Sequence, residues 1–221
     1  RPRDAATLII VRRGGPVPRV LMGKRAASHR FMPNKFVFPG GKVDRGDGRI
    51  APPMDLHPDV MTRLCRGCSP VRARALALAA IRETYEETGL VIGEPDSPTL
   101  KTRSPHWSAF LRHDINPRLD VLHYVARAIT PPYRTRRFDA RFFMVDAQHI
   151  QGDIQERPAG SGELLDLHWV ELPRAREMKA LPAITRSVLG ELGRRLQEGC
   201  GPADPGPFVY FRRGKSVVEM V

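Results

Sequence analysis

The sequence predicts an α/β fold, in which short strands and a few helices follow one another along the chain. Two observations support this prediction. Apolar runs of strand length recur along the chain, separated by segments rich in Gly and Pro. Residues 70–88 form a longer stretch with the start and end signals of a helix. A chain of 221 residues can bury a sizeable core, so we expect a single domain over residues 1–221.

The N-terminal part of the chain is expected to form a hairpin. Residues 5–12 (A-A-T-L-I-I-V-R) predict a buried strand, and residues 19–24 predict a second strand after a Gly-Gly-Pro turn. A short strand at 36–38 leads into Pro39, Gly40 and Gly41. A pair of glycines permits positive φ and lets the backbone approach a ligand closely.

Residues 48–69 are expected to be an irregular insertion with a short helix near 58–64. The long helix then begins at Ser69, a favourable N-cap, with Pro70 in its first turn, and Gly89 provides its C-terminal stop. Within this helix, residues 78, 81 and 85 are apolar or aromatic at helical spacing, so we expect that face to pack on the core. We expect the opposite face, with Glu83, Glu86 and Glu87, to point away from the core.

The remainder of the chain predicts further strands and helices. We expect C-terminal helices and a tail over 173–221 that pack on the core. The expected strands are 90–92, 119–129, 140–145, 164–172 and two short runs within 207–221, and the expected helices are 106–112, 173–179 and 182–197.

The chain is basic, with a net charge of +12. This favours anionic partners such as phosphate-bearing small molecules, nucleic acid or acidic membranes. The arginines are scattered, which argues against a nucleic-acid tail, and no apolar run is long enough to span a bilayer. The start lacks an initiator Met and shows no secretory signal, which leaves room for an upstream piece.

Three cysteines, an odd number, favour a reducing compartment, and we expect a cytoplasmic location. Cys65 and Cys68 form a C-x-x-C pair, but no second pair has the spacing of a structural zinc site. We therefore interpret them as free cysteines in a loop.

Glu83, Glu86 and Glu87 occupy positions i, i+3 and i+4 of the predicted helix. Such positions share one helix face, so the three carboxylates would repel one another. One interpretation is a solvated acidic surface. The other is a site for Mg²⁺ or Mn²⁺, because hard cations prefer oxygen ligands.

The surroundings of these glutamates favour the second interpretation. Gly41, Asp47 and the segment R-E-T-Y-E-E-T-G-L (82–90) resemble the Nudix box, G-x5-E-x7-R-E-U-x-E-E-x-G-U, where U is aliphatic. The chain departs from this pattern in three ways. Asp47 replaces a Glu, Thr84 replaces an aliphatic residue, and residues 48–81 stand where the pattern has about seven.

A split box of this kind is similar to the branch of peroxisomal coenzyme A diphosphatases that carry a long insertion inside the box. The segments 23–41 and 129–143 also resemble that branch. The resemblance implies the Nudix α/β/α sandwich, with a mixed β-sheet between helices and the box as loop–helix–loop. It also implies a metal-dependent hydrolase of a nucleoside diphosphate linked to another group.

The resemblance further implies roles for individual residues. Mg²⁺ or Mn²⁺ would be held by Glu83, Glu86 and Glu87, with the Gly41 carbonyl as a further ligand. Arg82 would pair with a box carboxylate and fix its rotamer. The general base would be Glu83 or Glu163, which precedes the predicted strand 164–172, with Asp166 as a further candidate. Residues that could contact substrate phosphates or the nucleotide are Arg25, His29, Arg136, Arg137 and Asp139.

The preferred substrate prediction is coenzyme A or its acyl esters, cleaved to 3′,5′-ADP and a phosphopantetheine. The alternatives are dinucleotides, nucleotide sugars or damaged nucleoside triphosphates. A rival of another class is a Nudix-like module that binds a nucleotide without cutting it, and a second rival is a nucleic-acid-binding protein that uses the positive charge. We expect a small-molecule nucleotide diphosphate as the partner, not a membrane or nucleic acid, and leave a homodimer open.

Overall fold

The computed structural model describes residues 1–27, 33–95, 100–152 and 164–221. Within these ranges one large sheet dominates the molecule. Its strands are β1 (Arg3–Arg12), β2 (Arg19–Arg25), β3 (Phe36–Val37), β4 (Gly40–Lys42), β7 (His123–Ile129), β8 (Phe138–Asp146), β10 (Leu164–Glu171), β11 (Pro207–Arg212) and β12 (Lys215–Met220).

The sheet is mixed. The strands lie in the order β10-β2-β1-β8-β7-β11-β12, while β3 pairs with β2 and β4 pairs with β1. The predicted hairpin is present, because β1 and β2 pair antiparallel through Val11 and Val20. In the centre, β1 and β8 run parallel over nine residue pairs, from Arg3–Phe138 to Val11–Asp146.

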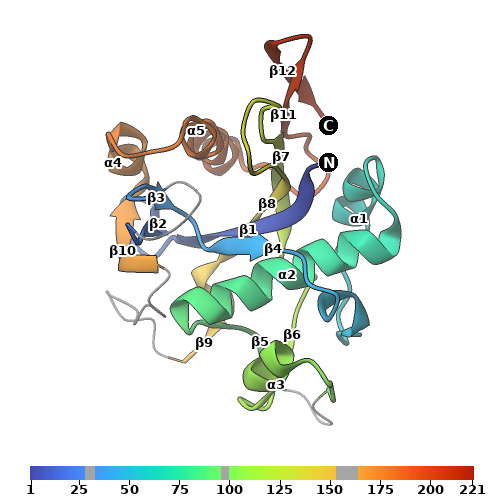
Figure 1. Cartoon of the computed structure of the whole chain (residues 1–221). Helices are drawn as coiled ribbons and strands as arrows, with labels where there is room; N and C mark the ends of the chain where they lie inside the picture. Colours follow the sequence, from blue (N-terminus) through green and yellow to red (C-terminus); the bar gives the residue numbers. More distant parts are fainter. Residues whose placement is uncertain (28–32, 96–99, 153–163) are drawn as a thin grey trace.

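Helices cover both faces of the sheet, as Figure 1 shows. The α/β architecture predicted from the sequence, a mixed sheet between helices, is therefore confirmed. The helices are α1 (Pro58–Cys65), α2 (Pro70–Thr88), α3 (Pro105–Leu111), α4 (Leu172–Glu177) and α5 (Ala183–Glu198), with 3₁₀ turns η1 (Asp47–Arg49) and η2 (Ala147–His149).

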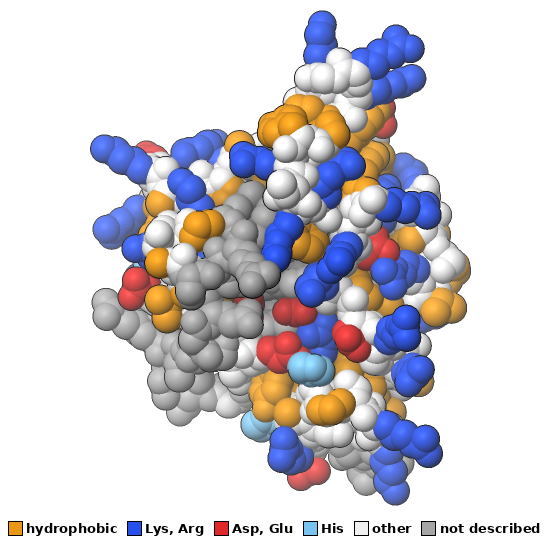
Figure 2. All heavy atoms as spheres, viewed as in Figure 1, with side chains coloured by type: hydrophobic (Ala, Val, Ile, Leu, Met, Phe, Trp, Pro, Cys, Tyr) orange, Lys and Arg blue, Asp and Glu red, His pale blue; other side chains and the backbone are white. Residues whose placement is uncertain are grey.

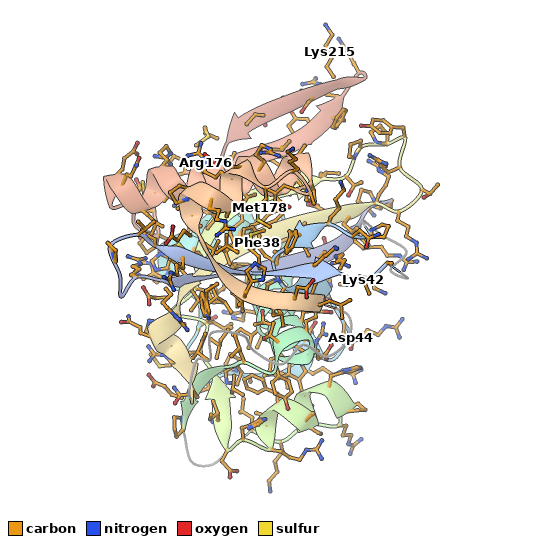
Figure 3. All side chains as sticks on the ribbon, turned by 90° about the vertical axis from the view of Figure 1, so that its left-hand side faces the viewer. Phe38, Lys42, Asp44, Arg176, Met178 and Lys215 are labelled. Atoms are coloured by element: carbon orange, nitrogen blue, oxygen red, sulfur yellow. The ribbon has the colours of Figure 1, made fainter. Side chains whose placement is uncertain are left out.

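The core has two layers, one on each face of the sheet. Side chains alternate along β1, so Leu8 and Ile10 pack in the cluster with α2, whereas Ile9 and Val11 pack in the cluster with α5. In Figure 3, Phe38 and Met178 lie together on the α5 side, and Asp44 lies on the α2 side. The chain between Phe38 and Asp44 therefore carries the first half of the box from one face of the sheet to the other.

A smaller sheet lies below α2 in Figure 1, next to α3. It consists of β5 (Val91–Pro95), β6 (Ile115–Pro117) and β9 (Ile150–Gln151). The sequence predicted a strand from 119 to 129, but that prediction was wrong at its start. Residues 119–122 form a turn, and β7 begins at His123. Leu119 and Leu122 are buried in this turn, so their apolar character reflects core packing and not strand pairing.

The insertion is part of the core. The short helix predicted near 58–64 is α1, and Leu56, Val60 and Leu64 are buried in the α2-side cluster. The C-terminal segment forms α4, α5 and then the hairpin β11–β12, which projects from the molecule at the top of Figure 1. β11 joins the main sheet by pairing in parallel with β7. Among the helices that the structure describes, none is long and apolar enough to cross a membrane.

Candidate active site

Helix α2 has the start and the end that the sequence predicted. The Ser69 side chain accepts a hydrogen bond from the Arg72 N–H, at 3.3 Å. Gly89 adopts φ 74°, and its N–H donates to the Tyr85 carbonyl at 2.8 Å. Between these ends the helix is buried on most sides and rich in alanine, which lets neighbouring backbone approach closely. The acidic face therefore lies in a fixed position at the C-terminal half of α2.

The glycine pair of β4 lies directly against two of the glutamates. The Gly40 N–H donates to Glu87 Oε2 at 2.8 Å. The Gly40 backbone has φ 153°, a value that residues with a side chain rarely adopt. A Cβ on Gly41 would lie only 2.3 Å from Glu83 Oε2. Any side chain at position 41 would therefore displace the Glu83 carboxylate.

Arg82 joins the two halves of the box across the insertion. Its Nε and Nη2 donate to the two carboxylate oxygens of Asp47, at 2.8 and 3.1 Å. Its Nη1 donates to Glu83 Oε1 at 2.9 Å and to Glu86 Oε2 at 3.1 Å. The prediction that Arg82 pairs with box carboxylates is thus borne out by these contacts.

Asp47 is fully buried and its acceptor capacity is used. Besides Arg82, it accepts hydrogen bonds from the Trp107 indole Nε1–H, at 2.9 Å, and from the Asp44 N–H, at 2.7 Å. Trp107, from α3, is also fully buried. The shorter acid at position 47 therefore orients Arg82, in spite of the insertion that follows it.

The charges of this cluster are coupled. Burial raises the pKa of Glu83, and the Arg82 charge opposes this effect without cancelling it. For Arg82, burial alone would lower the pKa, but the hydrogen bond to Asp47 and the charges of Glu83 and Glu86 raise it above its ordinary value. Arg82 is therefore a permanent cation that offsets part of the repulsion among the carboxylates.

The three glutamates are less exposed than a solvated acidic face would be. Glu87 is buried, and the side chains of Glu83 and Glu86 are 16% and 28% exposed. Figure 2 shows acidic side chains gathered with a histidine on this face of the molecule, beneath a band of Lys and Arg. The expectation that all three glutamates face away from the core is therefore wrong for Glu87.

His106 is a neighbour of this cluster that no sequence motif indicates. Its Nδ1 lies 2.8 Å from Glu86 Oε1. No spacing pattern connects His106, in α3, with the glutamates of α2, so the sequence contains no signal for this contact. Trp107 was missed for the same reason.

Two features of these residues are compatible with a divalent cation. Glu86 Oε1 is buried, yet no donor among the residues described makes a hydrogen bond to it. The missing Cβ of Gly41 leaves room for the Glu83 carboxylate against β4. Oxygen donors of this kind suit Mg²⁺ or Mn²⁺. As they stand, no three His, Cys, Asp or Glu side chains in the described ranges are grouped as metal ligands, so the metal site stays a prediction.

The contacts described for the other predicted site residues involve other parts of the molecule. Arg25, at the end of β2, pairs with Leu164 in the sheet. Asp166 is exposed, with φ 49°, at an irregular point of β10. His29 and Glu163 lie outside the described residues.

The cluster predicted at 136–139 lies elsewhere. Arg136 is exposed, and Arg137 Nε donates to the Thr130 carbonyl at 3.1 Å. Asp139 forms ion pairs with Arg127 and Arg141, and Arg141 also contacts Asp4, the partner of Arg72 in the first turn of α2. From Arg72 to Glu83 the helix rises roughly 16 Å. The Asp139 network therefore lies near the opposite end of α2, and its role in substrate binding stays a prediction.

A pocket of about 620 Å³ lies beside the edge strand β10 and α4. Among the described residues that line it, none belongs to the predicted site. They are Arg19, Phe36, His168, Trp169, Val170, Glu171, Arg174 and Met178.

Comparisons with known proteins agree with this geometry. No model of a known protein family matches the chain. The curated protein "Putative nudix hydrolase 7" of Caenorhabditis elegans is 27% identical over 179 residues, 76% of this chain and 51% of that protein. The crystal structure of a NUDIX hydrolase from Alicyclobacillus acidocaldarius is 28% identical, with a TM-score of 0.66, covering 86% of this chain and 90% of that one.

The matches support the assignment of the chain to the Nudix hydrolase superfamily. A MutT protein from Methanosarcina mazei Go1 shares the Nudix fold at 18% identity and a TM-score of 0.50, covering 89% of this chain and 97% of that chain. The chain spans about half the length of the curated relative that it matches. The superfamily predicted from the split Nudix box is thus supported, whereas the coenzyme A diphosphatase branch is not tested by these matches.

Proposed function

We propose that this Nudix chain is a metal-dependent pyrophosphohydrolase, which cleaves a nucleoside diphosphate linked to another group. The observation that carries the proposal is the Arg82 cluster. One guanidinium holds Asp47, Glu83 and Glu86 together. Gly40 and Gly41 bring the backbone of β4 against Glu87 and Glu83. A structural role alone would not require three carboxylates around one guanidinium, two of them partly exposed to solvent.

In this proposal Glu83, Glu86, Glu87 and the Gly41 carbonyl hold Mg²⁺ or Mn²⁺. A bound divalent ion would neutralise pyrophosphate charge and make the attacking water more acidic. Arg82 positions the carboxylates, because its Nη1 donates to both Glu83 and Glu86 while its Nε and Nη2 hold Asp47. The backbone of β4 prevents the helix face from shifting away.

Glu83 is the candidate general base within the described part of the site. Burial raises its pKa, and a carboxylate with a raised pKa is a better proton acceptor. Glu163 is the second candidate. Glu163→Gln separates them, because it should lower kcat if Glu163 is the base and leave kcat unchanged if Glu83 is. Glu83→Gln cannot do so, since Glu83 is also a proposed metal ligand.

The preferred substrate is coenzyme A or an acyl ester of it, cleaved to 3′,5′-ADP and a phosphopantetheine. The support is the position of the insertion between Asp47 and Arg82, which resembles the split box of coenzyme A diphosphatases. Dinucleotides, nucleotide sugars and damaged nucleoside triphosphates are the alternative substrates. We also propose a reducing, cytoplasmic location, which the free thiols of Cys65, Cys68 and Cys200 support.

A substrate screen tests the proposal. The chain is incubated with coenzyme A, acetyl-coenzyme A, dinucleotides, nucleotide sugars and nucleoside triphosphates, with Mg²⁺ or Mn²⁺, and the products are resolved by chromatography. We expect 3′,5′-ADP from coenzyme A. Turnover of a dinucleotide but not of coenzyme A would remove the preferred substrate and retain the reaction class.

Glu86→Gln tests the reaction class, that is, whether turnover depends on the proposed metal site. It keeps the size of the side chain and removes its charge, so we expect metal-dependent turnover to fall at least about a hundredfold. Binding of a nucleotide without turnover by the wild-type chain would favour a sensing module instead. DNA binding that falls steeply with salt and is unchanged by Glu86→Gln would favour a nucleic-acid-binding protein.

A further inference from the structure

His106 is held beside the glutamates by a rigid neighbour. It lies in the first turn of α3, and the next residue, Trp107, is fully buried and donates its indole N–H to Asp47. The Trp107 ring also packs against Phe110, with ring centroids 5.3 Å apart. The backbone at position 106 is therefore fixed relative to the box, although the His106 side chain itself is 57% exposed.

The contact between His106 and Glu86 places an imidazole nitrogen beside a carboxylate oxygen of the box. Nδ1 and Oε1 lie 2.8 Å apart, and Oε1 accepts no hydrogen bond from the described residues. A neutral imidazole whose proton is on Nε2 presents a lone pair at Nδ1. In that tautomer a cation bound by both Nδ1 and Glu86 Oε1 would replace the repulsion between two lone pairs with two attractive contacts.

The spacing of the two atoms also suits a shared cation. In an octahedral site with metal–ligand bonds of about 2.1 Å, adjacent ligands lie about 3 Å apart. The 2.8 Å separation of His106 Nδ1 and Glu86 Oε1 is close to that value. The imidazole belongs to α3 and not to the box, so it adds a nitrogen donor to a set that otherwise consists of oxygens.

We propose that His106 supplies an imidazole nitrogen to the divalent-cation site of the box and thereby favours first-row transition ions over Mg²⁺. This inference rests on the cation site of the proposed function. The physical reason is that Mg²⁺ prefers oxygen ligands and retains its water. Affinity for a nitrogen donor rises from Mn²⁺ to Co²⁺.

The test is isothermal titration calorimetry of the full chain with Mg²⁺, Mn²⁺ and Co²⁺. His106→Asn keeps an amide that can donate to Glu86 but removes the imidazole nitrogen. We expect it to weaken Co²⁺ about tenfold, Mn²⁺ less, and Mg²⁺ least. The visible absorption of bound Co²⁺ should also change on loss of the nitrogen ligand. His113→Asn is the control, because the His113 ring contacts Tyr85 and not Glu86.

The outcomes separate this inference from the proposed function. A graded loss with an altered Co²⁺ spectrum supports the inference, whether or not any pyrophosphate is hydrolysed. An equal loss for all three ions, no loss, or the same loss in His113→Asn overturns it. If Mg²⁺- or Mn²⁺-dependent hydrolysis persists in that case, the proposed function stands and only the role of His106 is rejected.

Discussion

Two buried arginines each connect segments that are distant in the sequence, but they bind different partners. Arg82 and Arg63 are 3% and 5% exposed. Arg82 donates mainly to carboxylates, those of Asp47, Glu83 and Glu86. Arg63 donates to backbone carbonyls, those of Tyr124, Pro202 and Val221.

Their pKa values move in opposite directions for this reason. Burial lowers the pKa of Arg63 to about 10, and the Arg195 charge adds to the effect. Arg82 is also penalised by burial, but its carboxylate partners more than compensate and raise its pKa. The comparison shows that equal burial has unequal consequences. The partners of Arg82 are carboxylates, so they require its positive charge. The partners of Arg63 are main-chain oxygens, so they require N–H donors in the right geometry.

The two arginines also connect the segments around the insertion in different ways. Arg82 reconnects the halves of the box that the insertion separates, through Asp47. Arg63, which lies within the insertion, instead contacts β7 and the C-terminal segment, and its guanidinium lies 4.8 Å from the centre of the Tyr124 ring. We infer that the insertion stabilises the C-terminal hairpin more than it shapes the glutamate site.

The largest effect is expected from Arg82→Met. This change leaves three carboxylates without their shared cation, and breaking a buried ion pair on one side costs about 3–5 kcal/mol. The free energy of unfolding, measured in urea, should fall by that amount, and hydrolysis should be lost. Arg82→Lys keeps the charge but not the guanidinium that binds both oxygens of Asp47. It provides a folded variant if the methionine variant does not fold. A loss below about 1 kcal/mol in the methionine variant would contradict the importance of charge at this position.

Arg63→Met should have a smaller and more local effect. Its partners are main-chain oxygens, so the expected loss is about 2–3 kcal/mol for the hydrogen bonds that its charged guanidinium donates. Hydrogen exchange should accelerate in residues 201–221, including the paired amides of Gly206 and Val221. Hydrolysis should persist. Arg66→Ala, an exposed neighbour, is the control. Loss of hydrolysis without faster exchange at the C-terminus would contradict the inference that Arg63 stabilises the C-terminal hairpin and not the glutamate site.

Sequence patterns predicted the elements that depend on local signals. Ser69, Pro70 and Gly89 gave the exact bounds of α2, because helix caps are short-range features. The pairing of β1 with β2 followed from their turn. The box motif also predicted that Arg82 would pair with a carboxylate, since such motifs record contacts between residues distant in sequence.

Contacts that no motif records were not predictable. Trp107 and His106 reach the box only because α3 and the small sheet fold beneath α2, and nothing in the sequence of 105–111 specifies that partner. The turn at 119–122 was mistaken for a strand because a buried turn and a buried strand can both be apolar. Glu87 was expected on the surface because periodicity within α2 cannot anticipate the approach of Gly40 from β4.

The smallest effect is expected at Arg74. Its guanidinium binds both oxygens of one carboxylate, as that of Arg82 does, but at the surface. Arg74 donates to both oxygens of Asp55, but their side chains are 40% and 47% exposed. Arg74→Ala should cost about 0–1 kcal/mol at neutral pH. The hydrogen bond from Arg74 lowers the pKa of Asp55 below 3.8. The contribution is therefore complete above about pH 3.8, the unfolded value, and is lost as the pH falls further, through the lowered pKa of the folded chain. Urea titrations of both chains between pH 7 and 3 measure the difference. A loss as large as that of Arg82→Met would show that burial does not distinguish the two arginines.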